Sequence, residues 1–88
     1  MRVESINVTN KFGLHARPCS LLVKTASKFR SEFKVKKDDM EINGKSIMGC
    51  MMLAAECGSK LLITVDGVDE DEALDEIMKL FEAKFSED

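Results

Sequence analysis

Residues 11–18 read Lys-Phe-Gly-Leu-His-Ala-Arg-Pro and contain the only histidine and the only proline of this 88-residue chain. Gly13 can take the backbone angles that a tight turn requires. Pro18 suits the first turn of a helix, where its missing amide hydrogen is not needed. Apolar side chains then recur at helical spacing, at Cys19, Leu22, Val23, Ala26 and Phe29. The stretch therefore predicts a turn that leads into a helix over about 16–29, with His15 at its N-terminal end.

An imidazole at that position has neighbours that favour phosphate chemistry. The first amide groups of a helix lack partners within the helix, and together with the helix dipole they form a site that attracts phosphate. Arg17 adds a planar cation that matches phosphate oxygens. The dipole and Arg17 both disfavour a charged imidazolium, so His15 is expected to stay nucleophilic near neutral pH. A lone histidine is more commonly a structural or surface residue, so this hypothesis depends on the surrounding glycine, arginine and proline.

The rest of the chain alternates between strand and helix patterns in the order βαββαβα. The patterns predict strands over 2–9, 33–36, 40–42 and 61–65, and further helices over 46–57 and 69–85. Alternating strands leave one face of a sheet exposed, so three helices should cover the other face and give an α+β fold. A ferredoxin-like fold shares the order βαββαβ, and the pattern alone does not separate the two.

Local signals mark where the second and third helices begin and end. Ser46 follows the Asn43-Gly44 turn and is expected to cap the second helix, which Gly58 would stop. Asp69 and Glu72 have the spacing of a capping pair at the start of the third helix. The buried stripe of that helix is expected to comprise Leu74, Ile77, Met78, Phe81 and Phe85.

Two motifs resemble those of a known family. Residues 13–18, Gly-Leu-His-Ala-Arg-Pro, resemble the active-site signature of HPr, the histidine-containing phosphocarrier family of the bacterial phosphoenolpyruvate-dependent sugar phosphotransferase system. Residues 43–49, Asn-Gly-Lys-Ser-Ile-Met-Gly, resemble that family's regulatory-serine motif, at the family's usual separation from the first. The resemblance covers essentially the whole chain. It implies an HPr-like open-faced β-sandwich, with a four-stranded antiparallel sheet and three helices on one face, formed by residues 1–88 as a single domain.

The resemblance also implies a function. His15 would accept a phosphoryl group on Nδ1 from phosphoenzyme I and pass it to an enzyme IIA, while Arg17 steadies the charged oxygens. Ser46 would be a regulatory phosphorylation site for an HPr kinase/phosphorylase, and a transcriptional regulator would be a further partner. No cofactor and no metal are implied. The chain would then be a regenerated phosphocarrier of sugar transport, and not an enzyme acting alone.

The second predicted helix is apolar on almost every side, which a short peripheral helix cannot bury completely. Ile47, Met48 and Met51 are therefore expected to remain exposed, as a flexible surface that suits several partners. These positions resemble the hydrophobic patch beside the active histidine of the HPr family. We also assign Ser20 and Lys24 to the partner-binding surface. The alternative interpretation is that the methionines only fill the core.

Charge is divided along the chain. Residues 1–65 carry 11 basic and six acidic side chains, whereas residues 66–88 carry two basic and ten acidic ones, for a net charge of −3 overall. The basic part suits acidic partner proteins. Nucleic acid is a poor candidate, because Phe33 is the only aromatic residue on a predicted strand.

The chain shows no apolar run long enough to span a membrane and no hydrophobic signal region, so we expect a monomeric cytoplasmic protein with no membrane insertion. Cys19, Cys50 and Cys57 match no common zinc spacing. If both lie on a helix, Cys50 and Cys57 are too far apart for a disulfide. All three are expected to be small, mostly buried thiols in a reducing compartment.

Other functional classes stay open from the sequence. A nitrogen-regulatory phosphocarrier paralogue would keep His15, although the Lys45-Ser46-Ile47 segment favours the sugar-system type. A purely regulatory HPr-like protein is a further alternative, against which the presence of His15 argues. A ferredoxin-like ligand-binding or RNA-binding module would show no phosphorylation at all.

Overall fold

The computed structural model describes residues 1–86 and has the predicted element order. Its strands and helices are β1 (Arg2–Asn7), α1 (Ala16–Ala26), β2 (Glu32–Lys37), β3 (Met40–Asn43), α2 (Ile47–Leu53), β4 (Lys60–Asp66), α3 (Glu70–Glu82) and the short 3₁₀ turn η1 (Lys84–Ser86). No helix among the described residues is both long enough and apolar enough to cross a membrane.

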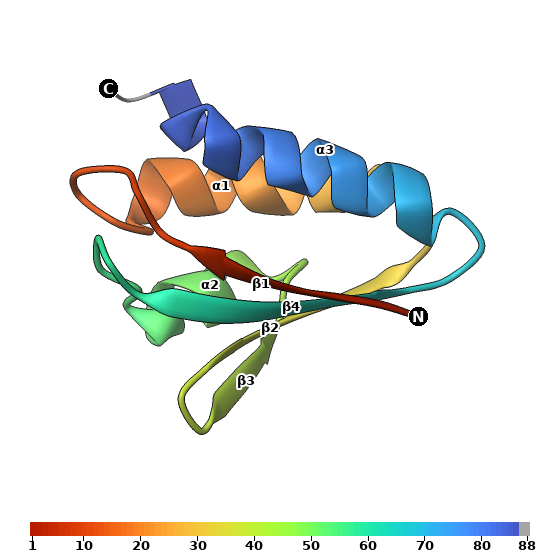
Figure 1. The fold of residues 1–88 in the computed structure, drawn as a ribbon, viewed down its shortest axis with the longest axis horizontal. Helices are drawn as coiled ribbons and strands as arrows, with labels where there is room; N and C mark the ends of the chain where they lie inside the picture. Colours follow the sequence, from red (N-terminus) through yellow and green to blue (C-terminus); the bar gives the residue numbers. More distant parts are fainter. Residues whose placement is uncertain (87–88) are drawn as a thin grey trace.

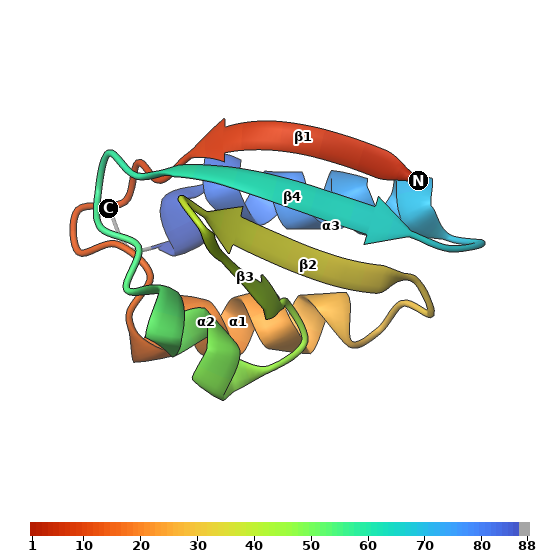
Figure 2. The same ribbon diagram turned by 90° about the horizontal axis from the view of Figure 1, so that it is seen from below.

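The four strands form one antiparallel sheet in the order β1-β4-β2-β3. Helices α1 and α3 lie across one face of this sheet, and the other face is open (Figure 1). Helix α2 packs against α1 and β3, at the edge of the sheet that β3 forms (Figure 2). The predicted α+β open-faced sandwich is thereby confirmed.

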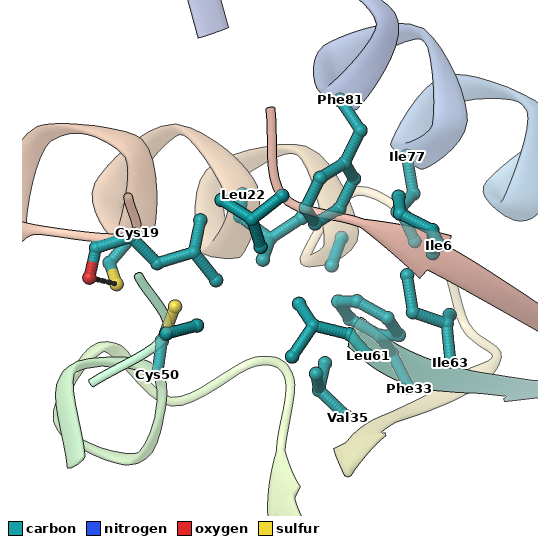
Figure 3. Packing of buried hydrophobic residues seen from close by; sticks show 14 of the residues in the cluster. Ile6, Cys19, Leu22, Phe33, Val35, Cys50, Leu61, Ile63, Ile77 and Phe81 are labelled. Atoms are coloured by element: carbon teal, nitrogen blue, oxygen red, sulfur yellow. Dashed lines mark hydrogen bonds between the residues drawn. The ribbon is translucent and has the colours of Figure 1, made fainter. Parts of the chain in front are cut away.

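The core lies between the sheet and the two long helices. Alternate residues of the central strands, among them Val35, Leu61 and Ile63, point to the helices and are fully buried. They meet Leu22 of α1 and Ile77 of α3 (Figure 3). Every second residue of a strand and every third or fourth residue of a helix thus face the same hydrophobic layer.

Helix α2 is shorter than predicted, because it ends at Leu53 and not near Cys57. Ala54 takes a left-handed conformation, with φ 49° and ψ 43°. The ammonium group of Lys37 donates to the carbonyl oxygens of Leu53 and Ala54, at 3.3 and 3.4 Å. These bonds satisfy carbonyl groups that a helix end leaves without partners. The prediction that Gly58 stops this helix is therefore wrong.

The other two helices also end earlier than predicted. Helix α1 ends at Ala26, and the amides of Lys28 and Phe29 bond the carbonyl groups three residues back in a tighter turn. Helix α3 ends at Glu82, so Phe85 lies beyond it, in η1. Phe85 is nevertheless buried and stacks edge-to-face on Phe81, with 4.9 Å between the ring centroids. Its burial is as expected, and only the element that carries it differs.

The predicted capping pair of α3 is wrong. Asp69 occupies the N-cap position, but its side chain makes no capping bond. It instead accepts hydrogen bonds from the amides of Arg30 and Ser31, at 2.9 and 3.0 Å, and from the Ser31 hydroxyl at 2.5 Å. Glu72 is exposed, and Glu70 supplies the local bond by accepting from the Gly67 amide at 3.1 Å. Asp69 therefore joins the start of α3 to the connection between α1 and β2.

This junction should make stability depend on pH. The Ser31 hydroxyl and the Arg30 amide lower the pKa of Asp69 below its ordinary value. A depressed pKa contributes stability above the unfolded value, near pH 4, and that contribution is lost as pH falls through the folded value. We expect Asp69→Ala to have a lower urea midpoint than the parent at pH 7, with the difference shrinking towards pH 2. Urea unfolding across that range measures it, with Asp39→Ala in the exposed β2–β3 turn as the control. A difference that stays constant with pH would contradict the ionic contribution of Asp69.

Candidate functional site

His15 is the N-cap residue of α1, with φ −94° and ψ −168°. It lies on the exposed surface, and its side chain makes no capping hydrogen bond. Its carbonyl oxygen accepts the first amide bond of the helix, from Cys19 at 3.0 Å. The structure thus places the imidazole at the N-terminal end of a helix, as the sequence predicts, with its ring accessible from outside.

The loop that carries His15 is fixed by the segment after α2. The amide of Leu14 donates to the carbonyl oxygen of Ala55 at 2.8 Å. Gly13 has φ +69°, and a Cβ at this position would overlap that carbonyl oxygen and lie 2.9 Å from the Cα of Glu56. Glycine is therefore required for two reasons: the backbone has a positive φ, and the backbone of Ala55 and Glu56 leaves no room for a Cβ.

Asn10 closes the loop from within. It is buried, and its Nδ2 donates to the carbonyl oxygen of Gly13 at 2.6 Å. The Gly13 amide in turn donates to the carbonyl oxygen of Asn10 at 3.1 Å. These bonds fold the loop back on itself and hold the turn before His15 in one shape. Sequence reasoning did not single out Asn10, although an asparagine three residues before a glycine is a common turn signal.

The surroundings of His15 suit an anion. Pro18 has no amide hydrogen, and the Cys19 amide is already bonded, so Ala16 and Arg17 supply the amides of the first turn that have no partner within the helix. This turn carries no acidic side chain. The Arg17 side chain is exposed two residues from the histidine. Backbone donors, the helix dipole and a guanidinium group therefore gather at one end of α1.

Phe12 is a neighbour of His15 that sequence reasoning missed. Its ring stands edge-to-face to the imidazole, with 6.2 Å between centroids, and it is 70% exposed. The Lys11 ammonium lies 5.5 Å from the centroid of the Phe12 ring. An aromatic side chain this exposed gains little from its own burial, so it is suited to contact a partner that approaches His15. No periodicity reveals such a residue, because it lies in a turn.

Helix α2 presents an apolar surface on the outside of the molecule. We call the α2 patch the set of exposed side chains Ile47, Met48, Met51 and Met52. Met48 is 74% exposed, which excludes the alternative that it fills the core. Met52, at 62% exposed, belongs to this patch although the sequence did not mark it. The inward side of the helix is anchored by Cys50 and Leu53, so the exposed side can bind without opening the core.

Ser46 caps α2 as predicted, and its Oγ accepts a hydrogen bond from the Gly49 amide at 3.1 Å. It is half-buried and adjoins Ile47 of the α2 patch. Lys45 is held nearby by a 2.7 Å bond from its ammonium group to the carbonyl oxygen of Phe29. The structure therefore joins the serine and the apolar patch on one helix.

The remaining predicted site residues lie along α1. Ser20 and Lys24 are both exposed, the first in the second turn and the second in the last turn. Helices α1 and α2 pack against each other, so His15, Arg17 and the α2 patch occupy neighbouring elements (Figure 2). Lys24 is about 10 Å along the axis from Arg17, because a helix rises 1.5 Å per residue. It therefore belongs to the surrounding surface and not to the anion site.

The chain is similar to known proteins over most or all of its length. The family model described as "PTS HPr component phosphorylation site", where PTS is the phosphotransferase system, matches residues 3–83. The phosphocarrier protein HPr of Treponema pallidum (strain Nichols) is 47% identical over 88 residues, covering 100% of both chains. The HPr-like protein Crh of Bacillus subtilis (strain 168) is 40% identical over 74 residues, covering 84% of this chain and 87% of its own.

A solved structure shows the same fold. The crystal structure of HPr-C-His from Thermoanaerobacter tengcongensis superposes with a TM-score of 0.96 at 45% identity, covering 100% of this chain and 99% of that one. The match extends over the strands, the helices and the connections between them, so it decides against the ferredoxin-like alternative. The chain belongs to the HPr family, the phosphocarrier proteins of the phosphotransferase system.

Proposed function

We propose that His15 accepts a phosphoryl group from phosphoenzyme I and passes it to an enzyme IIA of the sugar phosphotransferase system. The observation that supports this most is the exposed imidazole at the start of α1, on a loop fixed by Gly13 and Ala55. Membership of a phosphocarrier family supplies the class of reaction. The similarity to HPr-like proteins named Crh leaves a purely regulatory role as an alternative. The carrier role is favoured because this chain is 47% identical to an HPr and 40% identical to a Crh.

In the transfer, the lone pair of Nδ1 of His15 forms a bond to phosphorus while the bond between phosphorus and the donor breaks. The second transfer reverses this, and the N–P bond breaks as the acceptor on enzyme IIA forms its own bond. The amides of Ala16 and Arg17 and the Arg17 guanidinium would hold the charged oxygens in both steps. Because such a transfer depends mainly on in-line positioning, a shallow exposed site is sufficient, and the partner contributes the other half.

The test is incubation of the chain with enzyme I and phosphoenolpyruvate, followed by measurement of protein-bound phosphate before and after acid. We expect phosphate that is acid-labile, as phosphohistidine is, and dependent on enzyme I. No labelling would contradict the proposal and favour a purely regulatory protein. Repeating the assay with a nitrogen-branch enzyme I separates the paralogue alternative, because faster labelling by that enzyme would place the chain in the nitrogen branch.

The α2 patch is proposed as the docking surface for enzyme I and enzyme IIA. Met48→Asp should weaken docking about tenfold, because a charge must then be desolvated in an apolar contact. The free energy of unfolding should change by less than about 0.5 kcal/mol, because Met48 is already in water. Titration calorimetry with enzyme I and urea unfolding measure the two quantities.

Val68→Asp is the matched control for Met48→Asp. Val68 is 88% exposed and lies in the β4–α3 connection, at the opposite end of the molecule from the loop that precedes α1 (Figure 1). It should leave docking unchanged. If Met48→Asp unfolds the domain, or if both variants weaken docking equally, the patch has no specific role.

Ser46 is proposed as a regulatory phosphorylation site for an HPr kinase/phosphorylase. A phosphate beside Ile47 adds a charge of about −1.5 to −2 at the edge of the patch, which would repel an acidic partner and resist desolvation. Ser46→Asp should reproduce part of this and lower the initial rate of His15 phosphorylation about threefold to tenfold at low salt. Ser46→Ala should keep nearly the parent rate while losing about 1 kcal/mol of helix capping.

The rates are measured with enzyme I at low and physiological salt, with Ser27→Asp at the far end of α1 as the charge control. A Ser46→Asp variant as fast as the parent at both salts would leave Ser46 as a helix cap only.

A transcriptional regulator is proposed as a partner that distinguishes the phosphorylated form of Ser46. We further propose that residues 1–88 act as a single, monomeric, cytoplasmic domain, which places the chain where both transfer partners can reach it.

A further inference from the structure

Two cysteines face each other between α1 and α2. Cys19 and Cys50 are 0% and 1% exposed, and their sulfur atoms lie on the facing sides of the two helices (Figure 3). The Cys19 thiol donates to the carbonyl oxygen of Leu14 at 3.6 Å. Both are free thiols in the structure, and the phosphoryl transfer described above uses neither.

The environment makes the two thiols unequal. A hydrogen bond between them lowers the pKa of Cys19. The same bond, together with burial, raises the pKa of Cys50. The lower pKa makes Cys19 the thiol that ionises more readily when it is reached by solvent, and Cys50 faces it across the two helices.

We propose that Cys19 and Cys50 are a redox-sensitive pair that hydrogen peroxide converts to a disulfide, which joins the first turns of α1 and α2. The Cys19 thiolate attacks one peroxide oxygen, the O–O bond breaks, and water leaves with the thiol proton, which gives a sulfenic acid on Cys19. The Cys50 sulfur then attacks the Cys19 sulfur, the S–O bond breaks, and a second water leaves with the Cys50 proton. One peroxide is reduced by two electrons and the two thiols are oxidised to one disulfide.

A disulfide between Cys19 and Cys50 would affect the site around His15, because both cysteines lie in helix turns next to it. The Cys19 amide bonds the His15 carbonyl oxygen, and the Cys50 amide bonds the Ser46 carbonyl oxygen, both at 3.0 Å. A disulfide is only about 2.05 Å long, shorter than any contact between sulfur atoms that are not bonded, so its formation draws the two turns together. It would shift the α2 patch relative to His15. This effect on transfer rests on the proposed function, whereas formation of the disulfide does not.

The burial of both sulfurs limits the reaction to moments when α2 opens locally. That helix has seven residues and ends in a left-handed residue, so it is a short element that can separate from α1 without unfolding the sheet. Cys57, in contrast, is exposed and lies outside both helices. It supplies an internal reference for a thiol that an oxidant reaches at once, and Cys57→Ala removes its reactions.

The experiment treats the reduced Cys57→Ala protein with hydrogen peroxide under native conditions, then blocks remaining thiols with N-ethylmaleimide in denaturant. We expect a monomer that carries no maleimide and yields a peptide linking Cys19 to Cys50, lighter by two hydrogen atoms than the two separate thiol peptides. Dithiothreitol should return this peptide to the two thiols, whereas any oxygen added to the exposed methionines stays in place. The variant that also carries Cys50→Ala should instead carry added oxygen or maleimide on Cys19. Two intact thiols after peroxide treatment long enough for the backbone amides of α2 to exchange with solvent would overturn the proposal, as would sulfinic acid without a cross-link.

The functional arm compares enzyme I-dependent labelling of the reduced and oxidised Cys57→Ala proteins. We expect the oxidised form to be slower by about threefold or more and to recover with dithiothreitol. Equal rates would overturn the effect on transfer while leaving the disulfide in place. If the reduced protein accepts no phosphate, the proposed phosphocarrier function fails, and the mass measurement still decides whether the disulfide forms.

Discussion

His15→Ala is expected to abolish enzyme I-dependent phosphorylation, by about a thousandfold or more, because no other imidazole exists in the chain to replace it. The fold should remain. His15 is exposed, and its backbone carbonyl, which bonds the Cys19 amide, is kept in the variant. The free energy of unfolding should change by less than about 0.5 kcal/mol. Initial rates of acid-labile labelling and urea unfolding of the same preparation measure both effects.

Phe12→Ala is a suitable control, because it alters the contact to the imidazole without removing the nucleophile. It should reduce the labelling rate but leave the final amount of bound phosphate unchanged. If the His15→Ala protein still reached full acid-labile labelling, His15 would not be the acceptor.

Gly13→Ala is expected to lower the free energy of unfolding by about 3 kcal/mol, and with it the melting temperature by about 15 °C. Two causes add together. A non-glycine residue at φ +69° is strained, and its Cβ would overlap the carbonyl oxygen of Ala55. That oxygen accepts the Leu14 amide bond, so relief of the overlap must disturb the loop that carries His15. The labelling rate should therefore fall as well, even at temperatures where the variant is folded.

Gly58→Ala separates the two causes. Gly58 has φ +95°, but nothing lies within 4 Å of the position that a Cβ would take. This variant should show only the conformational cost of about 1 kcal/mol and keep the parent labelling rate. Calorimetric melting of both variants tests the account, and equal losses of stability would show that the contact with Ala55 is not important.

The strands could be predicted from sequence because their signal is local. Phe33 and Val35 alternate with lysines, and Leu61 and Ile63 alternate with more exposed residues, so the period of two marks both the strand and its buried face. The Ser46 cap could be predicted for the same reason, since its partner is Gly49, three residues away.

The ends of the helices could not be predicted, because partners distant in sequence decide them. Helix α2 stops where Lys37 reaches its last carbonyl groups and where Ala55 bonds the His15 loop. Aspartate is a common local cap, but the carboxylate of Asp69 accepts hydrogen bonds from Ser31, 38 positions earlier, instead of from its own helix. Such competition between local and tertiary partners is invisible to a pattern read along the chain.

The candidate site divides in the same way. His15, Arg17 and the α2 patch follow from motif and composition, and the structure brings them onto adjoining helices. Phe12 escapes sequence reasoning because an aromatic residue in a turn has no periodic neighbours. Sequence reasoning also cannot show that Cys19 and Cys50 face each other, because they are 31 positions apart and are brought together only by the packing of α1 on α2.

The central claim is that His15 carries the phosphoryl group, and nitrogen NMR of the phosphorylated protein tests it most directly. The chain is labelled with ¹⁵N in its single imidazole and treated with enzyme I and phosphoenolpyruvate, and the ring nitrogens are observed together with ³¹P coupling. The account predicts phosphorus coupled to Nδ1 of His15, with the coupling lost when an enzyme IIA is added and takes the group. Bound phosphate with no coupling to either ring nitrogen would contradict it.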